Sequence, residues 1–104
     1  MASGEDISPG DSGWVLVGGK NNTEHLLPPT MIFLGREECD VILVSQSVDK
    51  RHAVITYDHY LHRFKVKDLN SANGTYVNNS RIPEQTYVKL NHMDTLRFGY
   101  DILL

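Results

Sequence analysis

The sequence Lys67-Asp-Leu-Asn-Ser-Ala-Asn-Gly-Thr-Tyr-Val-Asn78 joins two short runs of strand-forming residues through a cluster of turn-forming ones. The run that enters it, Arg63-Phe-Lys-Val-Lys67, alternates strictly between charged and apolar residues. This period of two predicts a strand that buries Phe64 and Val66 and turns its cations to solvent. The pair Asn73-Gly74 tolerates the positive φ of tight turns. We therefore expect two strands joined by a compact polar loop.

Similar short runs recur on both sides of this stretch. Turn clusters separate them at intervals of roughly ten residues, a spacing typical of an antiparallel sandwich or barrel. We expect strands at Trp14–Val17, Glu24–Leu27, Met31–Leu34, Val41–Val44, Ala53–Tyr57, Arg63–Lys67, Thr75–Val77, Tyr87–Leu90, Thr95–Phe98 and Tyr100–Leu104. Turn breakers interrupt every stretch that could otherwise keep helical spacing, so long helices are not expected.

The chain has 104 residues, which is enough for one hydrophobic core and too few for two. Residues 1–13 are rich in Gly, Ser and Asp and predict a flexible tail, so the domain spans residues 14–104. Ten Lys and Arg against thirteen Asp and Glu give a net charge of −3. A general nucleic-acid binder carries a strong positive balance instead, so we do not expect a nucleic-acid partner.

Membrane insertion and secretion are not expected either. The tail lacks the basic and apolar segments of a signal peptide, and apolar runs such as Val41-Ile-Leu-Val44 are far too short to span a bilayer. The single cysteine, Cys39, fits an intracellular protein. Its neighbours Glu37, Glu38 and Asp40 disfavour the thiolate, which makes it a poor nucleophile. We expect no enzymatic activity and no cofactor.

Five histidines raise the question of a metal site. Asp58, His59 and His62 lie within one predicted turn, but a strong zinc site needs four ligands at suitable spacing. We interpret this group as a solvated turn and expect no metal. His52 opens the apolar run Ala53-Val-Ile55, and we expect it to be a hydrogen-bonded residue that pins a loop to a strand end.

Three polar loops remain, each beside a predicted strand. They contain Gly35-Arg36, then Ser47-Val-Asp-Lys-Arg-His52, then Asn70-Ser-Ala-Asn-Gly-Thr75. Together they offer several cations and an Asn-Gly turn, which are suited to holding a phosphate and a peptide backbone.

In this order and spacing the three segments resemble the forkhead-associated domain, a reader of phosphothreonine peptides. Lys67–Asn78 and the closing Leu96-Arg-Phe-Gly99 belong to the same resemblance, which runs from about Trp14 to Leu104. It implies an all-β sandwich of about eleven short, mainly antiparallel strands with the ligand loops at one end.

The resemblance also implies a role for particular residues. Arg36 would donate to the phosphate, and Lys50 would assist it. Asn73 would hold the peptide backbone, with Ala72 beside it. Members of the family use the residues that match Gly35, His52 and Gly74 to support the site.

One position departs from the family pattern. Asp49 stands where the family usually has a serine that contacts the phosphate, and an ionised carboxylate repels a phosphate. Two hypotheses follow: a phosphothreonine-reading module, or a scaffold domain that binds a protein partner, or itself, without phosphate. In the second, Asp49 could pair with Arg36, Lys50 or Arg51 and occupy the site from within.

A narrower similarity concerns the stretches Ser47–Asp58, Arg81–Pro83 and Arg97–Asp101. They resemble the forkhead-associated domain of a large centrosomal, microtubule-associated family. This implies a cytoplasmic location at the centrosome or cytoskeleton, with the nucleus left open. The default oligomeric state is a monomer.

Overall fold

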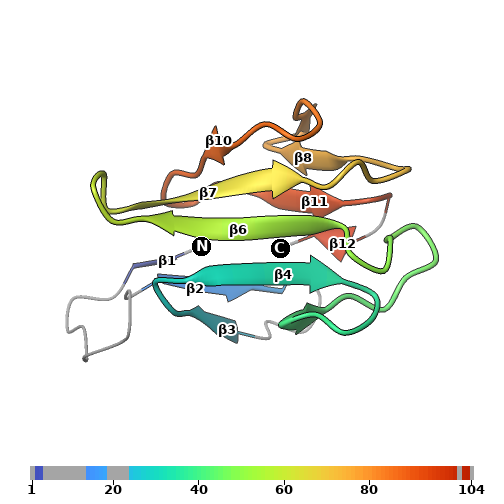
Figure 1. Ribbon diagram of the computed structural model, residues 1–104, viewed down its shortest axis with the longest axis horizontal. Helices are drawn as coiled ribbons and strands as arrows, with labels where there is room; N and C mark the ends of the chain where they lie inside the picture. The colour runs from blue at the N-terminus through green and yellow to red at the C-terminus, as the bar shows by residue number, and fades with distance from the viewer. Residues whose placement is uncertain (1, 4–13, 19–23, 101, 104) are drawn as a thin grey trace.

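The computed structural model describes residues 2–3, 14–18, 24–100 and 102–103. These residues form twelve short strands in three sheets and no helix, so none of the described residues belongs to a helix that could cross a membrane (Figure 1). The five-stranded sheet has the order β10 (Val88–Lys89), β7 (Arg63–Asp68), β6 (Ala53–Asp58), β4 (Met31–Gly35) and β5 (Val41–Ile42). The four-stranded sheet contains β12 (Ile102–Leu103), β11 (Leu96–Phe98), β8 (Thr75–Val77) and β9 (Ser80–Arg81). The three-stranded sheet contains β1 (Ala2–Ser3), β2 (Trp14–Val17) and β3 (Glu24–Leu27).

The expected all-β architecture is confirmed. Figure 1 shows the five-stranded sheet in front of the other two, and the core lies between the layers. Neighbouring strands pair antiparallel except β4 and β5, which pair in parallel through Leu34–Val41 and Gly35–Ile42. Along β7 burial alternates as expected, since Phe64 and Val66 are fully buried and Arg63 is exposed.

Each of the ten predicted runs contains a strand, although β5, β10, β11 and β12 are shorter than expected. Two strands are additional. One is β9, a two-residue strand that pairs with β8 through Tyr76–Arg81 and Val77–Ser80. The other is β1, where Ala2 and Ser3 pair with β2 inside the segment that the sequence predicts to be a flexible tail. The rest of that tail, residues 4–13, lies outside the described residues.

The topology brings the three polar loops to one end of the sandwich. Strands β4 and β7 end there and β6 begins there, because β6 runs antiparallel to both neighbours. Figure 1 shows the loops after β4, β5 and β7 together at the right-hand end, with the β6–β7 hairpin at the opposite end. The separation means that the loops and the Asp58–His62 turn belong to different surfaces.

Candidate functional site

The first loop begins at a crossing point that only glycine can occupy. A Cβ on Gly35 would lie 2.1 Å from the Lys50 carbonyl oxygen, far inside van der Waals contact. Directly after it, the Arg36 N–H donates to the Asp49 carbonyl oxygen at 3.0 Å, and the Glu37 N–H donates to the Lys50 carbonyl oxygen at 3.3 Å. The backbone that carries Arg36 is therefore fixed against the β5–β6 loop.

The second and third loops are joined by two side-chain hydrogen bonds. The Ala72 N–H donates to Asp49 Oδ2 at 3.2 Å, and Asn73 Nδ2 donates to the Ser47 carbonyl oxygen at 2.9 Å. Both bonds link residues more than twenty positions apart in sequence. The side chains of Asp49, in the β5–β6 loop, and Asn73, in the β7–β8 loop, thus each bind the backbone of the other loop.

His52, which is fully buried, also joins the β5–β6 and β7–β8 loops. Its Nδ1 accepts the Asp49 N–H at 3.1 Å, so Nε2 carries the proton and donates to the Gly74 carbonyl oxygen at 2.8 Å. The His52 N–H donates to the Leu34 carbonyl oxygen at 2.9 Å, and its ring meets Phe98 edge-on at 5.8 Å between centroids. The ring and the backbone N–H of His52 together tie the end of β4, the Asp49 loop and the residue before β8 into one unit.

A buried carboxylate, not singled out from the sequence, shapes the third loop. Asp68 is 1% exposed, and it accepts hydrogen bonds from the Ser71 N–H, the Ser71 hydroxyl and the Thr75 hydroxyl. The Ser71 hydroxyl oxygen in turn accepts the Gly74 N–H at 3.0 Å. The available sequence signal was an aspartate three residues before the serine of the turn Asn70-Ser-Ala-Asn-Gly74, a pattern typical of side chains that cap turns.

Gly74 is the second position where the backbone demands glycine. Its φ is +87°, and a Cβ there would lie 2.6 Å from Arg81 Nε. The Arg81 side chain, from the unpredicted strand β9, therefore lies directly against the backbone next to Asn73. Sequence reasoning did not include Arg81 in the site, because a strand of two exposed residues leaves no periodic pattern.

The described charged residues at the loop end do not form the ion pair that was expected for Asp49. Asp49 forms no ion pair with Arg36, Lys50 or Arg51 among the described residues; its carboxylate accepts the Ala72 N–H instead. Lys50 has Glu37 at 3.9 Å with both side chains mostly exposed, a pair worth little, and Arg51 stacks over Phe33. The idea that Asp49 occupies the site by pairing with a cation is wrong, because the backbone N–H of Ala72 is the partner within its reach.

Arg36 is half-buried, and no carboxylate of the described residues lies within ion-pair distance of it. An arginine without such a partner can bind an external anion through charge-assisted hydrogen bonds. The site therefore combines a backbone-anchored arginine, an exposed lysine and a held asparagine. Such a group can bind a phosphate and a neighbouring peptide bond.

The comparison with protein families agrees with this geometry. A family model described as the FHA domain matches residues 32–99, which include all three loops. The chain belongs to the FHA domain family. FHA domains are noncatalytic interaction modules.

Solved FHA structures share the fold over most of the chain. The structure of Mycobacterium tuberculosis EmbR in complex with a low affinity phosphopeptide superposes with a TM-score of 0.76 and 29% identity, covering 86% of this chain and 22% of that one. A structure from work on phosphothreonine-dependent FHA domain interactions has a TM-score of 0.75 and 26% identity, covering 86% and 91%. The first of these neighbours is thus bound to a phosphopeptide, and the second takes part in phosphothreonine-dependent interactions.

Among curated proteins, this FHA domain is similar to the mouse Smad nuclear-interacting protein 1. The two are 38% identical over an 81-residue alignment that covers 64% of this chain and 21% of that protein. The chain spans about a fifth or less of the length of the curated relatives that it matches.

Proposed function

We propose that this FHA domain binds phosphothreonine-containing peptides through the loops after β4, β5 and β7. The observation that carries the proposal is the arrangement of Arg36 and Asp49. The guanidinium has no carboxylate partner among the described residues, whereas the carboxylate is engaged with the Ala72 N–H on the neighbouring loop. An anionic ligand would therefore meet an unpaired arginine at the loop end.

Each candidate residue has a distinct task in this proposal. Arg36 donates charge-assisted hydrogen bonds to the phosphate, and Lys50, whose ion pair is long and exposed, adds a second cation. Asn73 and Ala72 lie against the peptide backbone. Gly35, His52 and Gly74 hold the three loops in place through the contacts described above.

The test compares a phosphothreonine peptide, selected from an oriented library, with its unphosphorylated twin. We expect amide resonances of Arg36, Lys50 and Asn73 to shift with the first peptide only. Arg36→Ala should weaken binding by about tenfold or more, since a hydrogen bond to a charged group contributes roughly 1.5–3 kcal/mol. Isothermal titration measures the loss.

Arg63→Ala is the matched control, because it removes an exposed arginine at the first residue of β7, next to the β6–β7 hairpin that Figure 1 shows at the end opposite the loops. It should leave phosphopeptide affinity within about twofold. Equal responses to both peptides, or equal losses in Arg36→Ala and Arg63→Ala, would contradict a phosphate-reading site.

A scaffold function without phosphate reading is the alternative, and Asp49 is the residue that favours it. Its carboxylate still adds negative charge beside the proposed phosphate position, even with Ala72 donating to one oxygen. Asp49→Ser separates the two. A marked gain in phosphopeptide affinity identifies the carboxylate as an obstacle to reading, and no gain shows that it is not the obstacle.

The partner in this proposal is an intracellular protein that carries phosphothreonine. One relative is named for a nuclear interaction, which favours testing both nucleus and cytoplasm. The centrosomal and cytoskeletal location stays a prediction from the narrower sequence similarity. Three of the relatives, the Arabidopsis PPP1R8 homolog, Smad nuclear-interacting protein 1 and human kanadaptin, carry no centrosomal name. Imaging of the tagged full-length protein checks the location.

A further inference from the structure

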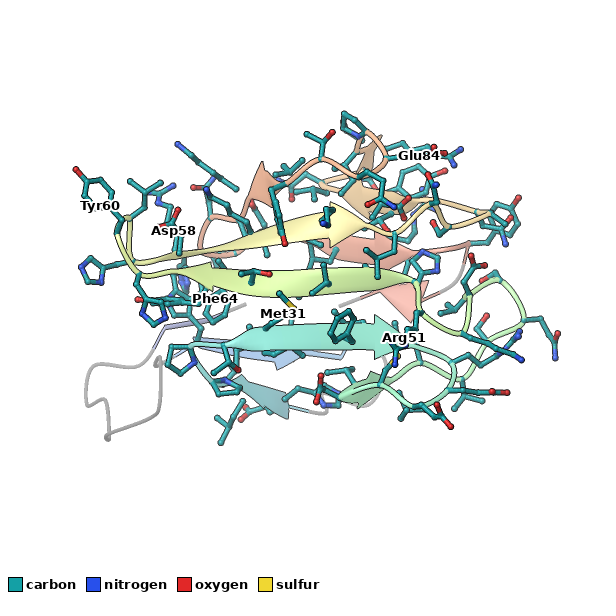
Figure 2. The ribbon with its side chains drawn as sticks, viewed as in Figure 1. Met31, Arg51, Asp58, Tyr60, Phe64 and Glu84 are labelled. Carbon is teal, nitrogen blue, oxygen red and sulfur yellow. The ribbon has the colours of Figure 1, made fainter. Side chains whose placement is uncertain are left out.

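The outer face of the five-stranded sheet is built from two rows of side chains that cross four strands. The register places Phe33, Val54 and Lys67 in one row, with the Tyr87 ring under Lys67. The next row is Met31, Thr56, Lys65 and Lys89. Phe64 and Val66 point into the core, so the residues that alternate with them on β7 point outward. Figure 2 shows Met31 and Asp58 on this front face, with Arg51 at its right-hand end.

Positive charge gathers on this face although the whole chain carries −3. We call it the basic face, defined by Arg51, Arg63, Lys65, Lys67 and Lys89, which are five of the ten basic residues. The outward positions of β6 and β7 include one carboxylate, Asp58, and it is paired with Lys65 at 2.9 Å. Asp40, at the β5 edge, accepts the Phe33 N–H.

One contact on the basic face is unfavourable without a ligand. Lys65 and Lys89 lie directly opposite each other on β7 and β10, and like charges in that position destabilise a sheet. Asp58 neutralises Lys65 in part and has no counterpart at Lys89 among the described residues. An external carboxylate placed between the two ammonium groups would relieve the repulsion.

The aromatic rings of the face indicate which class of anionic partner fits. The Arg51 guanidinium lies 5.3 Å from the Phe33 centroid, and the Lys67 ammonium lies 4.7 Å from the Tyr87 centroid. Both outer ring faces are therefore covered by the chain's own cations. Binding of single-stranded nucleic acid relies on open aromatic faces for base stacking, so the arrangement favours a polypeptide.

We propose that the basic face binds an extended, acidic polypeptide segment of a partner protein, separately from the phosphothreonine loops. Outward residues on β7 repeat every ~6.7 Å, the same period as alternate residues of an extended peptide. Acidic residues at every second position would thus meet Arg63, Lys65 and Lys67 in turn. A shallow hollow of about 280 Å³, lined by Thr56, Tyr57, Asp58, Lys65 and Tyr87, has room for a side chain between them.

The test uses the full 104-residue chain and an end-capped nonapeptide with glutamate at alternate positions and serine between. We expect this peptide to shift the amide resonances of the domain along β6, β7 and β10. The double variant Lys67→Glu, Lys89→Glu should weaken binding about tenfold or more, because it reverses two of the contacted charges. Leu26→Glu, which adds a carboxylate at an exposed position of β3 in the three-stranded sheet, should change affinity by less than about twofold.

A variant of Lys89→Glu alone guards against loss of folding. Lys89 is exposed, and the new carboxylate faces Lys65, so the variant should fold and bind the peptide several-fold more weakly. Equal weakening by Leu26→Glu would overturn the proposal, since it would indicate that binding depends on the net charge of the domain alone. Displacement of the acidic peptide by a phosphothreonine peptide would also overturn it. So would tighter binding of a single-stranded oligonucleotide that the same variants abolish. A failure of phosphothreonine binding leaves these readouts unchanged.

Discussion

His52 is the residue on which the loop end depends most, because both ring nitrogens and the backbone N–H hold different segments. Asp68 has a similar role in the β7–β8 loop, where it accepts three hydrogen bonds from Ser71 and Thr75. Both side chains are almost fully buried. A buried polar group of this kind stabilises the fold only while its partners remain, so its removal costs more than the bonds it made.

We predict that His52→Ala lowers the free energy of unfolding by about 3 kcal/mol, through the cavity and the unpaired Asp49 N–H and Gly74 carbonyl. Urea denaturation measures the change. His62→Asn is the control, since His62 is exposed with a φ of +54° that asparagine tolerates. A loss in His52→Ala no larger than in the control would show that the bonds to Asp49 and Gly74 contribute little.

At this scale the sequence predicted which loops would meet, and it did not predict which atoms would bond. Asp49 illustrates the reason. Candidate cations stood next to it in sequence, but its partner is the main-chain N–H of Ala72, 23 positions away. Every residue carries such an N–H, so nothing in the residue types marks that one as the donor. Asp68 is a different case, because two of its three donors are the hydroxyls of Ser71 and Thr75, which the sequence does mark.

Among the elements, the β6–β7 hairpin is held by one carboxylate. Asp58 Oδ1 accepts the N–H groups of Tyr60 and Leu61 at 2.9 Å each, and Oδ2 pairs with Lys65. The Leu61 N–H, followed by Lys65, lowers the pKa of Asp58 to about 2 from 3.8. The turn that could have suggested a metal clip therefore uses its aspartate to cap the backbone.

The lowered pKa of Asp58 makes part of the free energy of unfolding depend on pH. Because the folded pKa is lower than the unfolded one, the contribution of Asp58 is complete above about pH 4 and is lost as pH falls towards 2. We predict that Asp58→Asn is less stable than wild type at neutral pH and loses less stability between pH 4 and 2. Denaturant midpoints across that range measure it.

Lys65→Gln is the companion variant for the hairpin. It removes the ion pair and keeps the Leu61 N–H, the largest cause of the lowered pKa. Most of the acid dependence should persist in it. A pH profile for Lys65→Gln as flat as that of Asp58→Asn would assign the effect to the ion pair.

The whole molecule has one core to which all three sheets contribute. Leu16 and Leu27 come from the three-stranded sheet, Phe64 from the five-stranded and Phe98 from the four-stranded sheet, and all four are fully buried. Trp14 meets the edge of Phe64 at 6.0 Å between centroids. The alternation of apolar residues predicted the contribution of β7 to this core, Phe64 and Val66, because period two fixes which side chains face inward. The pattern did not predict how the strands divide into sheets, since pairing joins distant segments. It did not predict the parallel β4–β5 pair either, because alternation carries no information on strand direction.

A shared core implies cooperative unfolding. We predict that Trp14 fluorescence, which reports on the three-stranded sheet, and far-ultraviolet circular dichroism, which reports on all strands, give coincident urea transitions. An earlier fluorescence transition would mean that the β1–β3 sheet opens before the rest. Leu96→Ala removes a fully buried side chain of the four-stranded sheet. It should lower the free energy of unfolding by about 2–5 kcal/mol and shift both transitions together to lower urea concentration.

The hydrogen bonds that join the three loops mostly end on main-chain atoms: the carbonyls of Ser47, Asp49, Lys50 and Gly74 and the N–H groups of Asp49 and Ala72. Such anchors are present whatever residue occupies the position. Exposed positions such as Lys50 and Ala72 can then be randomised while the scaffold is retained. The domain is thus suited to directed evolution of peptide-specific reagents, in which a selection varies only the outward side chains.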